Sequence, residues 1–154
     1  MTIVEASLEI GAPPKEVWKV VSDPRNLPMW NRHIVDVKNA PEDGLRTGSR
    51  YTTTVGFMGV RAGIACEAIE VRAPEYAEIR LHGLLDAVVE TRLRALSGDR
   101  TLLRHHVEYR FVGGPVGDLA ASVVQMFGAG TLLRRGMQAQ KRQAEDANGA
   151  SPGG

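Results

Sequence analysis

The sequence predicts an α+β fold in which a curved antiparallel sheet of about seven strands wraps around one long C-terminal helix. Two observations predict it. Between residues 34 and 112, apolar and polar residues alternate in short segments separated by turns, and no helical segment interrupts them. From Asp118 to about Glu145, apolar residues instead recur every three or four positions, as in an amphipathic helix. A sheet with one apolar face needs a cover, and only this helix is long enough to provide it.

The chain has 154 residues, the size of a single domain with one hydrophobic core. Its 19 Lys and Arg nearly balance its 18 Asp and Glu, so the formal net charge is +1. Because neither sign is in excess, we expect no binding to nucleic acid or to an anionic membrane. We place one domain at residues 1–145 and a disordered tail at residues 146–154, where Gly, Ala, Ser and Pro dominate.

Three features bear on the cellular compartment. The single cysteine, Cys66, cannot form an internal disulfide, and Glu5 and Glu9 interrupt the region where a secretion signal needs an apolar run. The most apolar stretch, Leu119–Leu133, is shorter than the roughly 20 residues of a membrane span and contains Gln125. These features favour a cytoplasmic protein without stable membrane insertion. They leave the oligomeric state open, a homodimer included.

The N-terminal third combines one strand with short helices. Residues 3–10 alternate with the two-residue period of a strand, whose apolar face comprises Val4, Ala6, Leu8 and Ile10. Residues 11–23 predict a helix, because paired prolines suit its first turn and Asp23-Pro24 ends it. Residues 24–30 contain two further prolines and predict a turn or a second short helix, before a strand near residues 33–39.

Five further strands complete the sheet, at residues 49–57, 60–71, 77–83, 87–96 and 100–112. Several glycines supply places where these strands can bend or bulge: Gly48, Gly56, Gly59, Gly63 and Gly83. A strongly curved sheet rarely closes tightly on a single helix. We therefore expect a cavity between the two.

The element order, together with residues 8–31, resembles the START-like, birch-pollen-allergen-like (SRPBCC) superfamily, which includes polyketide cyclase/dehydrase and lipid-transfer members. The most specific pieces are "APPKEVW" followed by "SDPRNLPMW", the alternating strand that ends in "FVGGPVGDL", and the long final helix. The resemblance spans nearly the whole chain. It implies the helix-grip fold and a deep, mostly hydrophobic pocket for sterols, polyketides, quinones or other lipid-like molecules. It does not specify a reaction, which has to be argued from the pocket lining.

Two adjacent histidines, His105 and His106, stand in the last predicted strand. Successive side chains of a strand point to opposite faces, so an unbent strand cannot bring both rings to one metal ion. His105 shares its face with apolar residues and points inward, whereas His106 lies among charged residues and points outward. An inward histidine is commonly a core residue with a local hydrogen bond, but beside a cavity it can exchange a proton with a ligand. His105 is therefore the first candidate for catalysis.

The same alternation places other side chains in the cavity. Tyr51 and Tyr109 join His105 as inward polar groups and candidate catalytic residues, although a core tyrosine with its hydroxyl at the rim is the commoner case. The predicted ligand-binding residues of the strands are Ile34, Thr53, Val55, Phe57, Val89, Thr91, Leu93, Val107 and Phe111. Those of the final helix are Met126, Phe127 and Gly130, with Gly128 and Gly130 indicating a kink or a need for space.

Three orientations stay open in the sequence. Residues 60–71 change phase, which predicts a bulge that could turn Glu67 or Glu70 inward, although a solvated glutamate is the commoner case. His33 could lie at the pocket mouth or on the surface.

Nucleotide-binding glycine motifs, zinc-binding Cys and His spacings and the Gly-x-Ser-x-Gly elbow are absent from the sequence. We therefore expect no cofactor and no metal.

Three functions fit these expectations. The first is a cofactor-free cyclase or dehydratase that folds a polyketide-like chain in the cavity and uses His105, with Tyr51 or Tyr109, for enolisation or loss of water. The second is a carrier that sequesters a lipid, a quinone or a natural product unchanged. The third is an interaction module whose own side chains fill the cavity.

Overall fold

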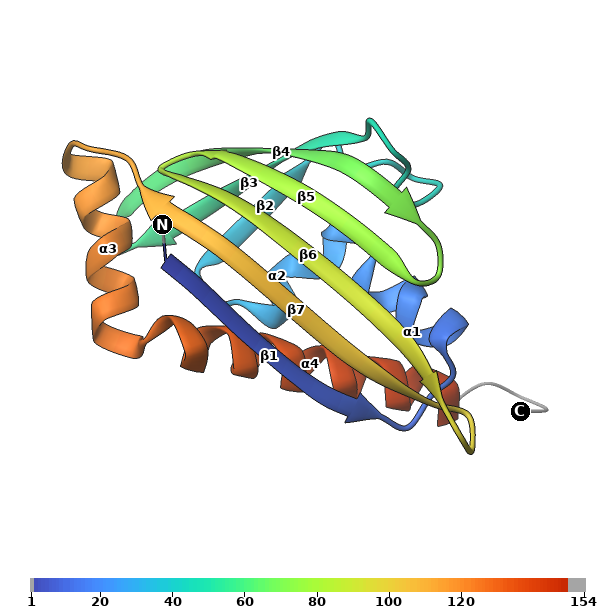
Figure 1. The fold of residues 1–154 in the computed structure, drawn as a ribbon. Coiled ribbons are helices and arrows are strands. Elements are labelled where there is room, and N and C mark those ends of the chain that lie inside the picture. Colours follow the sequence, from blue (N-terminus) through green and yellow to red (C-terminus); the bar gives the residue numbers. More distant parts are fainter. Residues whose placement is uncertain (1, 150–154) are drawn as a thin grey trace.

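Seven antiparallel strands form one curved sheet, and a long helix runs along its concave side (Figure 1). The computed structural model describes residues 2–149, save the side chains of Val116, Leu119 and Ala120. The strands are β1 Thr2–Ile10, β2 Ile34–Lys38, β3 Arg50–Phe57, β4 Val60–Arg72, β5 Tyr76–Gly83, β6 Leu85–Leu96 and β7 Arg100–Phe111. Their order across the sheet is β1-β7-β6-β5-β4-β3-β2. The predicted fold class, a curved antiparallel sheet around a C-terminal helix, is confirmed.

Short helices connect β1 to β2, as the prolines predicted. They are α1 Pro14–Val21, the 3-10 helix η1 Pro24–Asn26 and α2 Leu27–Trp30. Pro14 begins α1 at a position where a missing N–H breaks no helical hydrogen bond, and the Asp23 carboxylate accepts a bond from the Arg25 backbone N at 3.1 Å. At the end of this connection, the Trp30 indole nitrogen donates to Gln143 Oε1 at 3.0 Å. The connection is thereby tied to the C-terminal helix.

The C-terminal segment, expected as one helix over Asp118–Glu145, is divided in two. Helices α3 Pro115–Phe127 and α4 Ala129–Gly149 meet at Gly128, whose φ of +79° lies in the left-handed region that glycine adopts at little cost. Helix α3 stands at one end of the sheet, while α4 runs beneath it (Figure 1). The expectation of one continuous helix is wrong at Gly128, where only the kink was foreseen. In the described part of the chain, no helix has both the length and the apolar character of a bilayer span.

The helical segment also ends later than expected. Helix α4 continues through residues 146–149, which we had assigned to a disordered tail. The rest of that expected tail, residues 150–154, lies outside the described residues.

The hydrophobic core has two parts. The first packs α1 and α4 against β1, β6 and β7, and its fully buried residues include Ile10, Val17, Leu103 and Met137. The second belongs to the wall formed by β3, β4 and β5, and its buried residues are Tyr51, Ile64, Cys66, Ala68, Ile79 and Leu84. No residue of α4 packs into this second part. The helix therefore touches one side of the curved sheet and leaves a space on the other.

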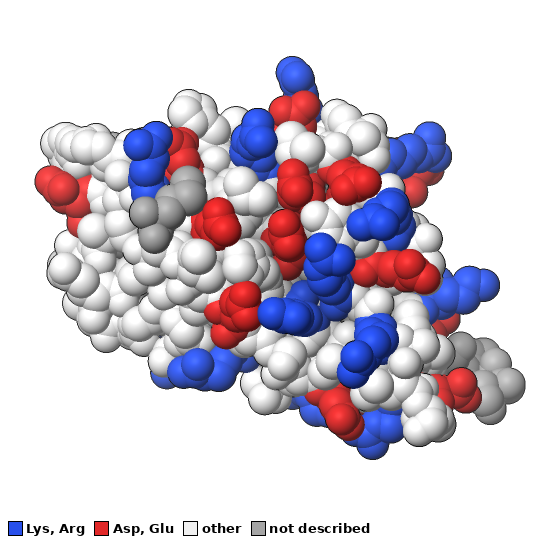
Figure 2. All heavy atoms as spheres, viewed as in Figure 1, with Lys and Arg blue, Asp and Glu red and all other residues white. Residues whose placement is uncertain are grey.

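The outer face of the sheet is polar, with ion pairs between neighbouring strands. Arg104 lies 3.0 Å from Glu5 across β7 and β1, and Arg110 lies 2.9 Å from Asp86 across β7 and β6. Figure 2 shows acidic and basic side chains intermixed over this face. Because the pairs are largely exposed, water and salt screen them, and each contributes little to stability. Their arrangement orients one face of the sheet to solvent and the other to the helix.

The two glutamates of ambiguous orientation belong to this outer surface. The register between β4 and β5 shifts between Ala68 and Glu70, so the predicted bulge is confirmed. Glu67 approaches Arg50 at 3.5 Å and Glu70 approaches Arg72 at 3.6 Å, with about half of each glutamate side chain exposed. Neither carboxylate enters the cavity, so the inward alternative is wrong.

Gly83 allows two strands to approach closely where β5 ends. A Cβ atom at this position would lie 2.6 Å from the backbone oxygen of Gly63, and φ is +156°. Gly83→Ala should therefore lower the free energy of unfolding by about 1–3 kcal/mol, measured by urea denaturation. Gly63→Ala is the matched control, because its Cβ would meet only ordinary contacts at 3.9 Å. Equal stability of the two variants would contradict this account of Gly83.

Candidate functional site

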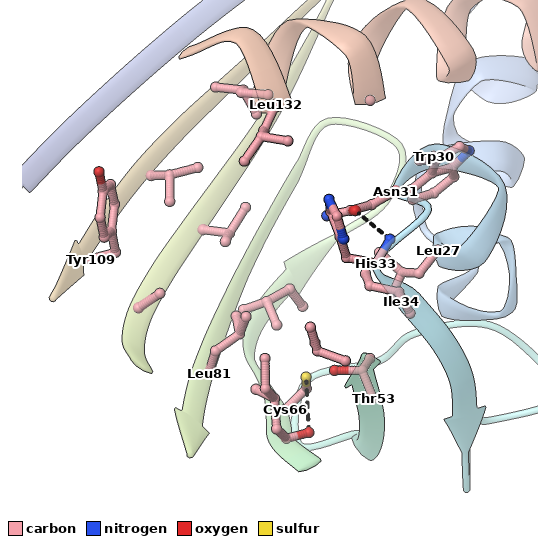
Figure 3. Close-up of a pocket in the computed structure, with 18 of the residues that line it drawn as sticks. Leu27, Trp30, Asn31, His33, Ile34, Thr53, Cys66, Leu81, Tyr109 and Leu132 are labelled. Atoms are coloured by element: carbon pink, nitrogen blue, oxygen red, sulfur yellow. Dashed lines mark hydrogen bonds between the residues drawn. The ribbon is translucent and has the colours of Figure 1, made fainter. Parts of the chain in front are cut away.

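A cavity of about 430 Å³ lies between the concave face of the sheet and helix α4. Tyr109 and Leu81 lie on one wall, Trp30 and His33 lie on the opposite wall, and Leu132 of α4 covers them (Figure 3). Most lining residues are aliphatic or aromatic, and the described lining contains no Asp, Glu, Lys or Arg. The interior is therefore hollow, apolar and without a fixed charge. The expectation, in the interaction-module alternative, that the protein's own side chains fill the cavity is wrong.

His105 lies in this lining with both ring nitrogens occupied. Its Nε2 donates to Gln140 Oε1 of α4 at 2.9 Å, and its Nδ1 accepts from the Thr91 hydroxyl of β6 at 2.8 Å. Burial lowers the pKa of His105, and the bond to Gln140 offsets this only in part. The ring is thus neutral near pH 7 and joins β7 to both β6 and α4. To exchange a proton with a ligand it would first have to give up a partner.

His106 lies on the outer face, as the strand alternation predicted. Its ring nitrogens approach Glu5 and Glu108, the latter at 3.3 Å. The hydrogen bond to Glu5, followed by that to Glu108, raises the pKa of His106. The adjacent histidines therefore have opposite surroundings: an apolar cavity for His105 and exposed carboxylates for His106.

Tyr51 and Tyr109 stand in one crosswise row of the curved sheet. Direct pairing runs from Tyr51 to Cys66, Leu81, Ala87 and Tyr109 in turn. Both tyrosines are buried, and they line the cavity from opposite ends of this row, on the same concave face of the sheet. Burial raises the pKa of the Tyr51 hydroxyl far above its usual range, so it stays protonated. The row supplies hydroxyl groups that can donate hydrogen bonds to a ligand.

Cys66 also faces the cavity, next to Tyr51 in this row. Its Sγ lies 3.7 Å from the backbone oxygen of Ile64, and the side chain is 5% exposed. Burial raises the pKa of the Cys66 thiol, so the thiolate needed for nucleophilic attack is scarce at neutral pH. Cys66 therefore lines the cavity as a small apolar residue.

The cavity opens near the turn between β3 and β4. Val60 lines the cavity and is also 45% exposed. Beside it, the His33 ring lies 5.6 Å from the ring of Phe57 and 5.6 Å from that of Phe127, measured between centroids. The backbone N of His33 donates to Asn31 Oδ1 at 2.9 Å, which fixes the start of β2 (Figure 3). His33, left open by the sequence, thus belongs to the pocket mouth.

The structure brings most of the predicted site residues together. The cavity lining contains His105, Tyr51, Tyr109, Ile34, Thr53, Val55, Phe57, Val89, Thr91, Val107 and Phe111. The roles assigned to them in binding or catalysis remain predictions.

Four predicted ligand-binding residues lie outside the lining. Leu93 packs into the first core part, because β6 continues past the cavity to α1. Met126 is 65% exposed, and Phe127 lies beside the ring of His33 but outside the lining, because the break at Gly128 separates their helix face from that of α4. A Cβ at Gly130 would meet the Arg134 guanidinium at 3.1 Å instead of the cavity. The assignments of Leu93, Met126, Phe127 and Gly130 to the lining are wrong.

Gln140, the polar residue that α4 contributes to the lining, was not among the predicted site residues. Leu133, Met137 and Gln140 follow one another at helical spacing, and all three face the cavity. The signal in the sequence was a polar residue at the end of an otherwise apolar stripe of helix residues.

The described residues contain no group of three or more His, Cys, Asp or Glu side chains that could hold a metal ion. The described lining supplies hydrogen-bonding groups from the two tyrosines, from Thr53 and from the group formed by Thr91, His105 and Gln140. Ser22, Asn31 and His33 add further polar side chains, and most of the other lining residues contribute apolar contact.

Comparisons with known proteins agree with this architecture. Residues 1–145 match the family model described as polyketide cyclase / dehydrase and lipid transport. No curated protein resembles the sequence closely enough to count as a match.

Solved structures are similar at low sequence identity. A Thermus thermophilus protein has a TM-score of 0.74 at 16% identity, covering 97% of this chain and 100% of its own. The Zhui aromatase/cyclase from a Streptomyces species has a TM-score of 0.75 at 15% identity, covering 99% and 98%. A START superfamily protein from Mycobacterium smegmatis has a TM-score of 0.65 at 19% identity, covering 92% and 97%. At these identities the likeness concerns the fold alone.

The two histidines predict opposite effects of pH on stability. Below about pH 6.5 the His105 ring becomes protonated in the unfolded chain, whereas burial keeps it neutral in the native state. Protonation therefore favours the unfolded chain, and His105 lowers stability as the pH falls. His106 binds its proton more tightly in the native state, so its contribution is present below about pH 6.5 and is lost as the pH rises through its raised pKa. Relative to the wild type, His105→Gln should gain stability on acidification and His106→Gln should lose it.

Urea unfolding between pH 5 and pH 8 would measure both trends. Parallel stability curves for the two variants would contradict the assignment of one buried and one ion-paired histidine.

Proposed function

Because the chain belongs to the polyketide cyclase / dehydrase and lipid transport family, we propose that it binds one neutral, apolar small molecule, polyketide-like or lipid-like, in the cavity beneath helix α4. The family match and the structural neighbours confirm the START-like resemblance read from the sequence. The observation that carries the proposal is the cavity itself. At about 430 Å³ it lies within the roughly 300–1,000 Å³ common for ligand pockets.

The lining supports a neutral ligand. A charged group carried into an apolar cavity loses its hydration and needs a partner of opposite charge. The described lining residues include no Asp, Glu, Lys or Arg, and the buried His105 is neutral, so the interior offers a charged ligand no such partner. Apolar contact contributes about 25 cal/mol for each Å² removed from water, so a ligand that fills the cavity can bind through its hydrocarbon surface alone.

Catalysis is the second candidate function. Tyr51 and Tyr109 present hydroxyls from opposite sides of the cavity, and water exclusion by the apolar walls would favour cyclisation or dehydration of a folded polyketide-like chain. A carrier that holds its ligand unchanged needs only the cavity. The pairing of both His105 nitrogens within the protein favours the carrier over a mechanism in which His105 is the general acid or base.

Filling part of the cavity should weaken the binding of an apolar dye. Val89→Trp places an indole in the lining, and we expect the affinity for N-phenyl-1-naphthylamine to fall by roughly tenfold, or about 1.4 kcal/mol. Val88→Trp is the matched control, because Val88 neighbours Val89 on the strand but does not line the cavity. Dye fluorescence titration measures both. Equal affinities of the two variants would mean that the dye, and by extension the ligand, binds elsewhere.

Native mass spectrometry after incubation with a lipophilic extract of the producing organism would separate a carrier from an enzyme. A carrier should retain one compound of unchanged mass, and His105→Gln or Tyr109→Phe should retain the same compound. A cyclase or dehydratase should convert a precursor into a product that has lost water, and a catalytic tyrosine should be needed for it. Conversion that survives both substitutions would rule out the catalytic roles of His105 and Tyr109.

A further inference from the structure

Gln140 is the last residue of α4 to line the cavity, eleven positions after Ala129, or about 16 Å along the helix. We propose that its side-chain amide nitrogen donates a hydrogen bond to the ligand, and that the ligand is a neutral apolar molecule with a carbonyl, hydroxyl or ether oxygen at its inner end. The inference rests on the proposed function, since it assigns the polar contact within the same cavity.

The amide nitrogen of Gln140 is open to the cavity. The side chain is only 6% exposed, and its Oε1 is occupied by His105 Nε2 at 2.9 Å. Its nitrogen has no hydrogen-bond partner among the described residues. Yet no fully enclosed side-chain nitrogen or oxygen in that part of the chain lacks a partner. The nitrogen is therefore not sealed in the protein, and the space that it borders is the cavity.

The orientation of this amide is fixed by the protein. Thr91 donates to His105 Nδ1, and His105 Nε2 donates to the amide oxygen, so the two bonds form one chain from β6 through β7 to α4. With its oxygen held, the amide directs its nitrogen to the cavity before any ligand arrives. A donor placed in advance saves the ligand the entropic cost of ordering it. His105 is accordingly a positioning residue for Gln140.

The chemistry of the group determines what it recognises. An amide nitrogen only donates, so its partner must be an acceptor. A buried donor without a partner costs about 1–3 kcal/mol, and the apolar residues around it, Leu133 and Met137, provide none. The described lining offers no Lys or Arg to pair with a carboxylate or phosphate, which favours a neutral acceptor as the partner. A ketone, ester, quinone, ether or alcohol oxygen on a hydrocarbon skeleton satisfies all three conditions.

Two isosteric probes test the inference: undecan-2-one and 2-methylundec-1-ene, which carry a C=O and a C=CH₂ group at the same position. The affinity of each probe is measured by its displacement of N-phenyl-1-naphthylamine from three proteins: the wild type, Gln140→Leu and Gln138→Leu. The ratio of ketone affinity to alkene affinity should fall roughly two- to tenfold in Gln140→Leu, the range for one hydrogen bond. It should be unchanged in Gln138→Leu, which makes the same substitution at an exposed position of α4.

Infrared spectroscopy of the bound ketone, labelled with ¹³C at the carbonyl, gives a direct signature. The carbonyl frequency should be lowered in the wild type and return toward its value in hydrocarbon in Gln140→Leu, which a purely structural role of Gln140 would not cause. Thr91→Val keeps the amide but releases His105, so its ratio should lie between those of the wild type and Gln140→Leu.

The outcomes separate the two proposals. If ketone and alkene bind, but neither their ratio nor the carbonyl frequency changes in Gln140→Leu, the donor role is overturned and the ligand-binding cavity stands. If neither probe displaces the dye from the folded wild type, both proposals fail. Should Gln140→Leu not fold, an unshifted carbonyl frequency in the wild type would by itself overturn the donor role.

Discussion

The structure depends on how α4 is held against a sheet that is wider than the helix. Polar contacts fasten the helix on the β1 side: Lys141 donates to the Glu9 backbone oxygen at 3.0 Å, and Glu145 accepts from the Gly11 backbone N at 2.6 Å. The core of α1, β1, β6 and β7 packs on the same side. Since no α4 residue packs into the core of β3, β4 and β5, the mismatch in width is preserved as a cavity. Together with the bond from Trp30 to Gln143, these contacts hold the helix in place over the cavity.

The strands were predictable because their rule is simple. A two-residue period assigns each side chain to a face, and the lining positions from Tyr51 to Phe57 and from His105 to Phe111 follow from it directly. The rule reached its limit at Leu93, which has the correct face but lies where α1 fills the space. Face is a local property of the chain. Whether that face meets a helix or a cavity is decided by elements far away in the sequence.

The helix was less predictable because the face on which each residue lies is counted from the residues before it, so a break in the helix shifts every later position. Counting one stripe from Asp118 to Glu145 carried the pattern of α3 across Gly128, where the chain changes direction, so Met126 and Phe127 were assigned to the wrong surface. Gln140 was missed for a related reason: an isolated polar residue in an apolar stripe looks like an error in the pattern until its partner is known. That partner, His105, lies 35 positions earlier in the chain. The sequence predicted that His105 points inward, but it did not predict that the Gln140 amide is its hydrogen-bond partner.

The protonated state of Cys66 bears on which molecules the protein can hold safely. Enones and similar electrophiles alkylate thiolates readily, and a cavity with a reactive cysteine in its wall would be modified by such a guest. Burial among β3, β4 and β5 keeps this sulfur as a thiol, which is a poor nucleophile. The wall of the chamber therefore presents this cysteine to a guest as a thiol and not as a reactive thiolate.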